Sequence, residues 1–243
     1  MSEEQKTCRI CLLPLNEYDM GEKNGYKLLA CEACGSVMVR PWPTQADLNA
    51  FFGDIQPEIV HFPKPQAEID NAGKILRKIT GNFTGRRFLD ASCHQGYAVM
   101  AAKKLGFQAK GIDSHDFFIS FAKDKYDADL FEHVSVQDYA ARGEQAEIIF
   151  SVESLCEQID PDGYMEALSK IIAPGGALYV QEPDGNSFHL PKKFADWDYI
   201  DPPVNFSWLS EKGMESLLAR HGFKIRKKFF TWGPFMRLIA VKK

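Results

Sequence analysis

The chain has 243 residues, of which 45% are apolar, and its formal net charge is −4. This length and apolar content can form a full hydrophobic core, so we expect one globular α/β domain with a small appendage. The negative charge argues against the basic surface that is typical of nucleic-acid-binding proteins. No apolar run approaches the ~20 residues of a membrane helix, and MSEEQKTC does not resemble a secretory signal. We therefore expect a cytoplasmic protein without a membrane partner.

Four of the six cysteines form two C-x-x-C pairs, CRIC at Cys8 and Cys11 and CEAC at Cys31 and Cys34. Two such knuckles direct four thiolates to one tetrahedral ion, which predicts a structural zinc site without an open coordination position. The alternatives are two disulfides, which a cytoplasmic setting disfavours, and four ordinary thiols, which the paired spacing disfavours. Spacing alone does not separate zinc from iron, although four cysteines in a ribbon favour zinc. The other two cysteines are expected to be buried apolar side chains: Cys93 and Cys156.

After the second knuckle, prolines and glycine interrupt the predicted strands and helices. The strands on both sides of that knuckle are expected in GYKLLACEACGSVMV, after which prolines interrupt the chain. Thr44 is a predicted N-cap for a short helix that carries Leu48. A longer helix is predicted from Gln66, with Gly81 as its C-terminal cap. These breaks predict three parts: a zinc ribbon over 1–43, a helical linker over 44–80 and a larger domain over 81–243.

From Arg86 onward, predicted strands and helices alternate, which is typical of a parallel sheet with helices on both faces. Asp160 is expected to cap one of the helices, with Pro161 at its first position. The predicted elements in chain order are: strand RRFLDA, helix 96–105, strand FQAKGID, helix 117–126, strand AEIIFSV, the helix after Asp160, a tight turn and strand in APGGALYVQEP, helix 210–221, and strands FKIRKKFF and FMRLIAVKK.

An ordered series of motifs from about Gln66 to Lys243 resembles the class I S-adenosylmethionine-dependent methyltransferases. The N-terminal cysteine pairs resemble those of a subgroup in which a zinc ribbon precedes the methyltransferase domain. The resemblance implies an α/β fold with a Rossmann-like, doubly wound, mostly parallel seven-stranded sheet and a C-terminal antiparallel strand. It also implies S-adenosylmethionine as the cofactor. The motifs are, in order, FLDASCHQG, GID, VQDYA, AEIIFSVESLCEQIDP and APGGALYVQEP.

The resemblance implies roles in cofactor binding for acidic and small residues near the strand ends. Asp90 would support the ammonium of the methionine tail, Gly96 would permit close approach, and Asp113 would accept hydrogen bonds from the ribose diol. Asp138 is placed to reach the adenine amine. For Asp113 the alternative is a helix cap. The complete set of candidate cofactor-binding residues is Asp90, Ser92, Gly96, Asp113, Ser114, Asp138 and Ser151.

Three positions depart from the pattern of the family. Ser92 and His94 stand where the family prefers glycine, and only Gly96 is retained. Serine is small, and histidine tolerates a positive φ better than most residues. We expect the cofactor to bind, and the alternative is a degenerate turn that no longer admits it. Gln158 stands where related sequences often have histidine, and glutamine cannot act as a base.

The segment over 183–205 is too long for a simple connection, and such loops are usually lids or binding loops. Its aromatic residues are either walls of an acceptor pocket or anchors that fix the loop to the core. The candidate pocket residues are Phe188, Trp197 and Tyr199. His189 and Glu182 are the candidate catalytic bases, needed only for an acceptor that arrives protonated.

The predicted function is an S-adenosylmethionine-dependent methyltransferase that acts on a small molecule or sugar-like metabolite and carries structural Zn²⁺. One alternative is an RNA methyltransferase whose ribbon contacts RNA, which would show salt-dependent RNA affinity. The other is a non-catalytic binding protein with a degenerate cofactor turn. The sequence does not fix the acceptor, the methylated atom, the oligomeric state or the pathway.

Overall fold

The computed structural model describes residues 6–53, 64–80 and 86–243. The chain divides into two compact units, each assembled from separated segments. Unit 1 comprises Met1–Ile55, Glu153–Met165 and Gln181–Leu238, and unit 2 comprises Gln56–Val152, Glu166–Val180 and Ile239–Lys243.

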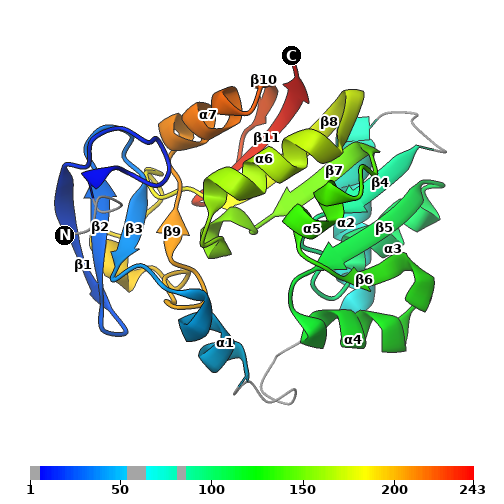
Figure 1. Ribbon diagram of the computed structural model, residues 1–243, viewed down its shortest axis with the longest axis horizontal. Helices are drawn as coiled ribbons and strands as arrows, with labels where there is room; N and C mark the ends of the chain where they lie inside the picture. The colour runs from blue at the N-terminus through cyan, green and yellow to red at the C-terminus, as the bar shows by residue number, and fades with distance from the viewer. Residues whose placement is uncertain (1–5, 54–63, 81–85) are drawn as a thin grey trace. The chain divides into compact units, whose positions relative to one another are not determined.

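Unit 2 contains four parallel strands: β4 (Arg87–Asp90), β5 (Gln108–Asp113), β6 (Phe131–His133) and β7 (Ala146–Val152). Strand β4 pairs in parallel with β5 and with β7, and β5 pairs in parallel with β6. Figure 1 shows the helices α2 (Pro65–Thr80) and α3 (Tyr97–Lys104) behind β4 and β5, with α5 (Val136–Ala141) in front. Strand β7 has the longest buried run of the four, with Ile148, Ile149 and Phe150 all buried, as expected for a parallel strand that is covered on both faces.

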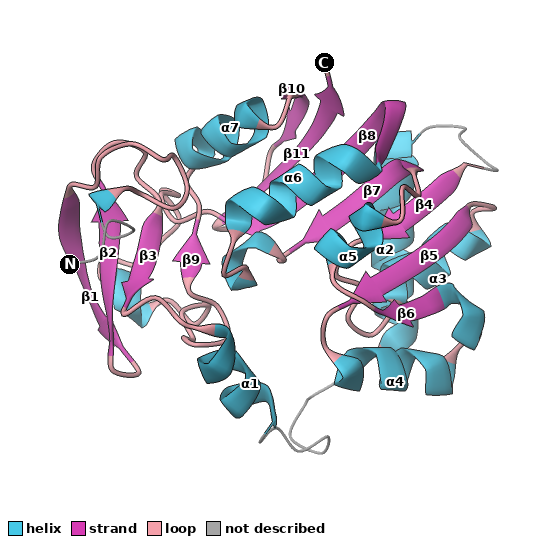
Figure 2. Cartoon of the chain, in the orientation of Figure 1, coloured by secondary structure: helices cyan, strands magenta, loops and turns pink. Residues whose placement is uncertain are grey.

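The strands continue into a seven-stranded sheet in the order β10-β11-β8-β7-β4-β5-β6. In Figure 2 the arrow of β11 points opposite to that of β7, so the sheet is mixed. This arrangement confirms the predicted Rossmann-like fold. One boundary differs, because β8 already begins at Ile172 and includes the APGG stretch that was predicted as a turn. The added strands are β8 (Ile172–Pro183), β10 (Phe223–Phe229) and β11 (Phe235–Lys242).

The predicted helices form close to their expected positions, and two of the caps are explicit. The Asp160 carboxylate accepts the backbone N–H of Gly163 at 2.9 Å, and Ser210 Oγ accepts the N–H of Gly213 at 3.0 Å. Three further α-helices are α4 (Asp116–Lys125), α6 (Pro161–Ile171) and α7 (Glu211–Arg220), and the short 3₁₀ turns include η3 (Ala128–Leu130), η4 (Leu155–Glu157) and η5 (Phe194–Asp196).

Unit 1 contains a four-stranded sheet that joins distant parts of the sequence. Its strands are ordered β1-β2-β3-β9, and each neighbouring pair is antiparallel. Val37 of β3 lies opposite Trp208 of β9, so a segment from late in the chain completes the ribbon sheet. The strands β2 and β3 flank the second knuckle as predicted. The bounds are β1 (Glu17–Lys23), β2 (Tyr26–Cys31), β3 (Val37–Arg40) and β9 (Ser207–Trp208).

The core of unit 1 is aromatic and combines the ribbon with the long loop. Trp208 packs edge-on against Phe194 at 5.5 Å between ring centroids, and Phe206 packs against Trp42 at 5.0 Å. Trp208 and Phe206 are fully buried. The ribbon therefore shares a hydrophobic core with residues more than a hundred positions away, which lets a short metal-binding segment bury apolar area.

The helix α1 (Gln45–Gly53) follows the ribbon, and Thr44 Oγ1 accepts the N–H of Asp47 at 3.2 Å, which confirms the predicted cap. The predicted cap at Gly81 lies outside the described residues. The division into 1–43, 44–80 and 81–243 stays a prediction. Within the described ranges, none of the helices has the length and hydropathy needed to cross a bilayer.

Candidate functional site

The turn between β4 and α3 is held by backbone hydrogen bonds to both neighbouring strands. The N–H of Ala91 donates to the carbonyl of Phe150 at 2.9 Å, and the N–H of Cys93 donates to the carbonyl of Ile112 at 3.0 Å. These bonds fix residues 91–96 at the carboxyl end of the parallel strands. In open α/β sheets, ligands bind at this edge.

Two buried carboxylates stand at the ends of the paired strands β4 and β5. Asp90 and Asp113 are 4% and 2% exposed. Burial, together with the negative charge of Asp113, raises the pKa of Asp90 well above its usual value. Two acidic side chains in a desolvated site favour a positively charged ligand that offsets their repulsion. The ammonium and sulfonium groups of S-adenosylmethionine meet this requirement, so the donor set fits that cofactor.

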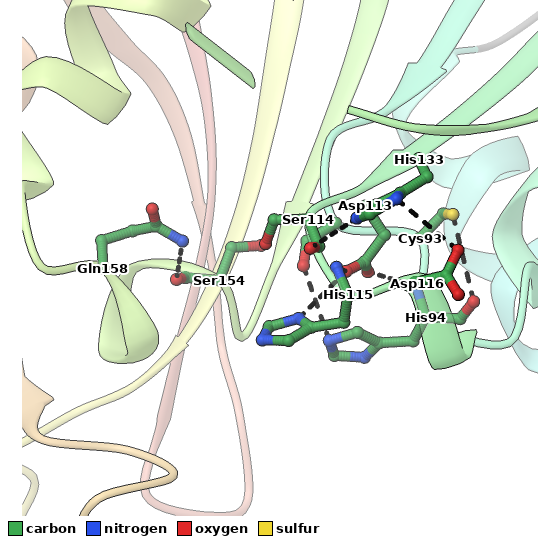
Figure 3. A network of polar contacts seen from close by, with 10 residues as sticks. Cys93, His94, Asp113, Ser114, His115, Asp116, His133, Ser154 and Gln158 are labelled. Carbon is green, nitrogen blue, oxygen red and sulfur yellow. Dashed lines mark hydrogen bonds and ion pairs between the residues drawn. The ribbon is translucent and has the colours of Figure 1, made fainter. Parts of the chain in front are cut away.

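Asp113 is the centre of a hydrogen-bond network that Figure 3 shows. Its Oδ2 accepts the backbone N–H of His94 at 3.0 Å, and its Oδ1 accepts the N–H of His115 at 2.9 Å. The His115 ring Nδ1 lies 3.1 Å from Oδ1. Burial acts to raise the pKa of Asp113, but the hydrogen bonds from His115 and the charge of His94 lower it overall. Asp113 thus stays ionised, and Oδ2 keeps acceptor capacity for a further hydroxyl donor.

His94, one of the two departures from the family pattern in this turn, and the retained Gly96 both have a left-handed backbone. His94 has φ 44° and Gly96 has φ 81°. The His94 ring packs on Phe118 at 4.8 Å between centroids. A Cβ at Gly96 would lie 2.5 Å from the ring of Phe131. Glycine is therefore needed at position 96 for its positive φ and for side-chain packing, a reason that differs from the predicted close approach to the cofactor.

The other candidate cofactor residues have distinct local roles. The carbonyl of Ser114 lies 3.0 Å from the ring Nε2 of His133, and Ser151 is fully buried on β7. Asp138 is exposed in the first turn of α5, where its carboxylate accepts the hydroxyl of Ser135 at 2.6 Å. Ser135 in turn accepts the N–H of Asp138 at 3.0 Å. This reciprocal pairing is a helix-capping arrangement, and the adenine role of Asp138 stays a prediction.

The four ribbon cysteines converge on one point in unit 1. Their sulfur atoms all lie within 4.8 Å of one another. The Sγ atoms of Cys8 and Cys34 are 3.9 Å apart, as are those of Cys11 and Cys31. Thiolates on a tetrahedral zinc ion, each about 2.3 Å from the metal, require sulfur spacings of this size. The arrangement fits Zn²⁺ with all four coordination positions filled by protein.

The long loop is anchored by most of its aromatic residues. Trp197 is buried in the core of unit 1. Its ring packs against the rings of Phe194 and Tyr199, with 5.9 Å and 5.6 Å between ring centroids. The Tyr199 hydroxyl donates a hydrogen bond to the Glu153 carboxylate. The anchor interpretation therefore fits Trp197, and Tyr199 combines ring packing with a polar contact. Phe188 differs, because 84% of its surface is exposed.

The two candidate bases occupy different environments. Glu182 is fully buried. Its carboxylate accepts the N–H groups of Ser154 and Leu155 at 2.9 Å each and that of Cys156 at 3.3 Å. Burial is the main reason that its pKa rises to about 8. Three amide donors favour a role in fixing the backbone that follows β7.

His189 is exposed and stacks on Phe188 at 3.9 Å between centroids. The catalytic roles of His189 and Glu182 stay predictions. Gln158, which replaces the expected histidine, donates to the carbonyl of Ser154 at 3.0 Å and so also stabilises this backbone (Figure 3).

Two notable residues were missed by sequence reasoning. Glu153 has φ 55° although it is not glycine. Its carboxylate also lies 3.1 Å from the Gln181 amide nitrogen. Backbone strain of this kind gathers at functional sites, yet no sequence signal identifies it. Arg237 lies in β11, and no sequence signal separates it from the other residues of that strand.

The profile described as "Methyltransferase domain" matches residues 61–228 of the chain. A ubiquinone biosynthesis O-methyltransferase from Ruegeria pomeroyi is 24% identical over 178 residues, which cover 65% of this chain and 71% of that protein. An S-adenosylmethionine-dependent methyltransferase structure from Mesorhizobium loti has a TM-score of 0.59 at 15% identity, covering 71% of this chain and 99% of its own. Magnesium protoporphyrin IX methyltransferase from Synechocystis, solved with bound cofactor, has a TM-score of 0.52 at 16% identity. The match covers 81% of this chain and 89% of that one.

The sheet order defines a Rossmann-like fold, and Asp90 and Asp113 stand at the ends of two of its strands. Because the family profile covers more than half of the sequence, the chain belongs to the methyltransferase-domain family. It is a class I S-adenosylmethionine-dependent methyltransferase.

Proposed function

We propose that the protein methylates a small-molecule acceptor, binds its cofactor at the turn between β4 and α3, and carries a structural zinc ion. The observation that carries the cofactor site is the pair of buried carboxylates, Asp90 and Asp113, beside a turn with the required positive φ values. The small-molecule acceptor is supported by relatives that are named for O-methylation in ubiquinone biosynthesis.

The proposed cofactor residues contact different parts of the cofactor. Asp90 faces the cationic methionine tail, and its raised pKa falls again when that cation is bound because opposite charges favour ionisation. Asp113 offers Oδ2 to a ribose hydroxyl while its other contacts hold the backbone of His94 and His115 in place. The remaining proposed contacts come from Ser92, Gly96, Ser114, Asp138 and Ser151.

When bound, the cofactor supplies an electrophilic methyl group for in-line displacement. The chain contributes binding, orientation and exclusion of water, which can account for most of the rate enhancement of such a reaction. The preformed hydrogen bond that the His94 N–H donates to Asp113 reduces the ordering that binding would otherwise require. A catalytic base is needed only if the acceptor arrives protonated.

The zinc proposal rests on the convergence of Cys8, Cys11, Cys31 and Cys34. A Cys₄ set leaves no position for water or substrate, so the role is structural. Such free thiols persist in a reducing compartment, and we therefore propose a cytoplasmic location.

The test of the cofactor proposal is a calorimetric titration of the metal-replete protein with S-adenosylhomocysteine. We expect binding to the wild type and a loss of about tenfold or more in affinity for Asp113→Asn, because a charged acceptor becomes neutral. Asp124→Asn is the matched control, since Asp124 is an exposed residue of α4 outside the turn. Absence of binding by well-folded wild-type protein would reject the cofactor proposal.

A further inference from the structure

A pocket of about 290 Å³ lies within unit 1, at the loop after β8 and the turn between β10 and β11. None of the proposed cofactor residues lines it. Phe235 and Leu238 of β11 and Phe229 of β10 form part of its apolar lining. Its volume is at the lower end of the range for small-molecule sites, so it suits a ligand with roughly one ring.

Two aromatic side chains line this pocket while remaining largely in solvent. Phe188, from the loop after β8, is 84% exposed, and Phe230, directly after β10, is 73% exposed. Large apolar side chains gathered at a concave site mark a binding surface more often than isolated exposed ones do. Flat aromatic faces stack favourably on a flat ligand. The pocket therefore favours an aromatic ligand.

Arg237 is among the residues that line the same pocket, and its side chain is positively charged. Its Nε atom is buried and has no hydrogen-bond acceptor within the described ranges. No carboxylate among the described residues forms an ion pair with its guanidinium. An unsatisfied buried donor costs about 1–3 kcal/mol, and a ligand carboxylate would satisfy it through the paired N–H donors of the guanidinium.

The other charged groups that line the pocket are already engaged. Lys228 forms ion pairs with Glu211 at 3.0 Å and with Glu215 at 2.8 Å. Asp184 Oδ1 accepts the N–H of Asn186 at 3.0 Å, and burial raises the pKa of its carboxyl. Among the described residues, Arg237 is thus the charge in the lining for which no ion-pair partner is found.

We propose that this pocket binds a small aromatic carboxylate, with the ring against Phe188 and Phe230 and the carboxylate on Arg237. The proposal names a ligand class and a residue that cofactor binding does not use. It does not depend on the zinc ion or on the cofactor turn.

The test is calorimetric titration of the full-length, metal-replete protein with 4-hydroxybenzoate. The control ligand is 4-hydroxybenzamide, which keeps the ring and the shape of the acid but lacks the charge. We expect the acid to bind at least about tenfold more tightly than the amide, because only the acid forms charge-assisted hydrogen bonds. Equal affinity for the two compounds, or no binding of the acid at millimolar concentration, would overturn the proposal.

Variants assign the binding to this pocket. Arg237→Gln is expected to remove the preference for the acid. Phe230→Ala, at an exposed position, is expected to lower the binding affinity of both compounds about tenfold. Arg226→Gln is the control, because Arg226 is an exposed residue of β10 that does not line the pocket. Acid binding that survives both pocket variants would place the ligand elsewhere and reject the assignment. The same samples are also titrated with S-adenosylhomocysteine. Cofactor binding without binding of the acid would reject the pocket proposal and leave the cofactor proposal intact.

Discussion

The Tyr199 hydroxyl donates a hydrogen bond to the carboxylate of Glu153, the residue that directly follows β7. Glu153 holds this contact at a strained backbone conformation, with φ 55°. Its N–H also donates to the carbonyl of Gln181 at 2.7 Å, and its side chain contacts the Gln181 amide. The long loop is therefore connected to the ends of two neighbouring strands through one glutamate.

Removal of this contact should loosen the loop. We expect Tyr199→Phe to lower the free energy of unfolding by about 1–2 kcal/mol, because a hydrogen bond to a charged acceptor is lost. Proteolysis within residues 184–200 should become faster. A double-mutant cycle with Glu153→Gln isolates the coupling between the two side chains. The control is Tyr18→Phe on β1, which is half-exposed. A coupling energy near zero would show that the ring contacts alone hold Tyr199.

Gly96 should be among the least replaceable residues of the cofactor turn. Its φ is 81°, and an added Cβ would lie 2.5 Å from the ring of Phe131. Gly143 provides a matched control, because its φ is 75° and no atom lies within 4 Å of its Cβ position. Gly143→Ala should cost about 1 kcal/mol of unfolding free energy for the positive φ. Gly96→Ala should cost about 1–3 kcal/mol more, because it also overpacks the site. Urea unfolding measures both values, and equal losses would contradict the packing argument.

Glu182 should make stability depend on pH. In the folded protein, burial raises its pKa from 4.5 to about 8, so the folded state keeps a proton that the unfolded state has released. The free energy of unfolding therefore falls as the pH rises between these values, by at most about 1.4 kcal/mol per pH unit. This contribution is complete below the unfolded pKa and is lost above the folded one.

Glu182→Gln removes the titration and should flatten this dependence. The measurement is urea unfolding of wild type and variant at several pH values from about 5 to about 8. Glu22→Gln, at an exposed position on β1, should leave the slope unchanged. A wild-type slope identical to that of Glu182→Gln would show that the three amide donors keep Glu182 ionised.

Zinc removal should destabilise unit 1 beyond the knuckles themselves. The Arg220 guanidinium donates to the carbonyl of Ile10 at 2.9 Å, and Ser210 Oγ donates to the carbonyl of Cys34, so both knuckles are bonded to α7 or to its cap. Metal analysis should find about one zinc ion per chain. Chelation should speed proteolysis around β9, whose pairing with β3 depends on the ribbon.

Cysteine variants separate the metal site from other thiols. Cys11→Ser should lose most of the bound zinc, because one of the four ligands is replaced by a poor one. Cys156→Ala is the control, since Cys156 is buried outside the cluster and should retain the metal. Full zinc content in Cys11→Ser, or none in the wild type, would reject the assignment.

The sequence by itself determined most of the elements and their order, although β6 and α5 are not among the predicted elements. Alternating strands and helices from Arg86 onward predicted the parallel sheet, because periodicity and caps such as Asp160 and Ser210 are local signals. The spacing of the four cysteines predicted their convergence for the same reason. Asp90 and Asp113 were found at the strand ends because each stands just before a turn.

Only the tertiary structure decided which distant residues meet. Ser207 and Trp208 complete the ribbon sheet through pairing with β3. A strand of two residues is too short for its sequence pattern to predict it. The amides that occupy Glu182 lie 26–28 positions away in sequence. That no carboxylate in the described part of the chain pairs with Arg237 also depends on how the segments pack. Contacts of this kind depend on packing between segments, and the local sequence pattern does not identify the partner residues.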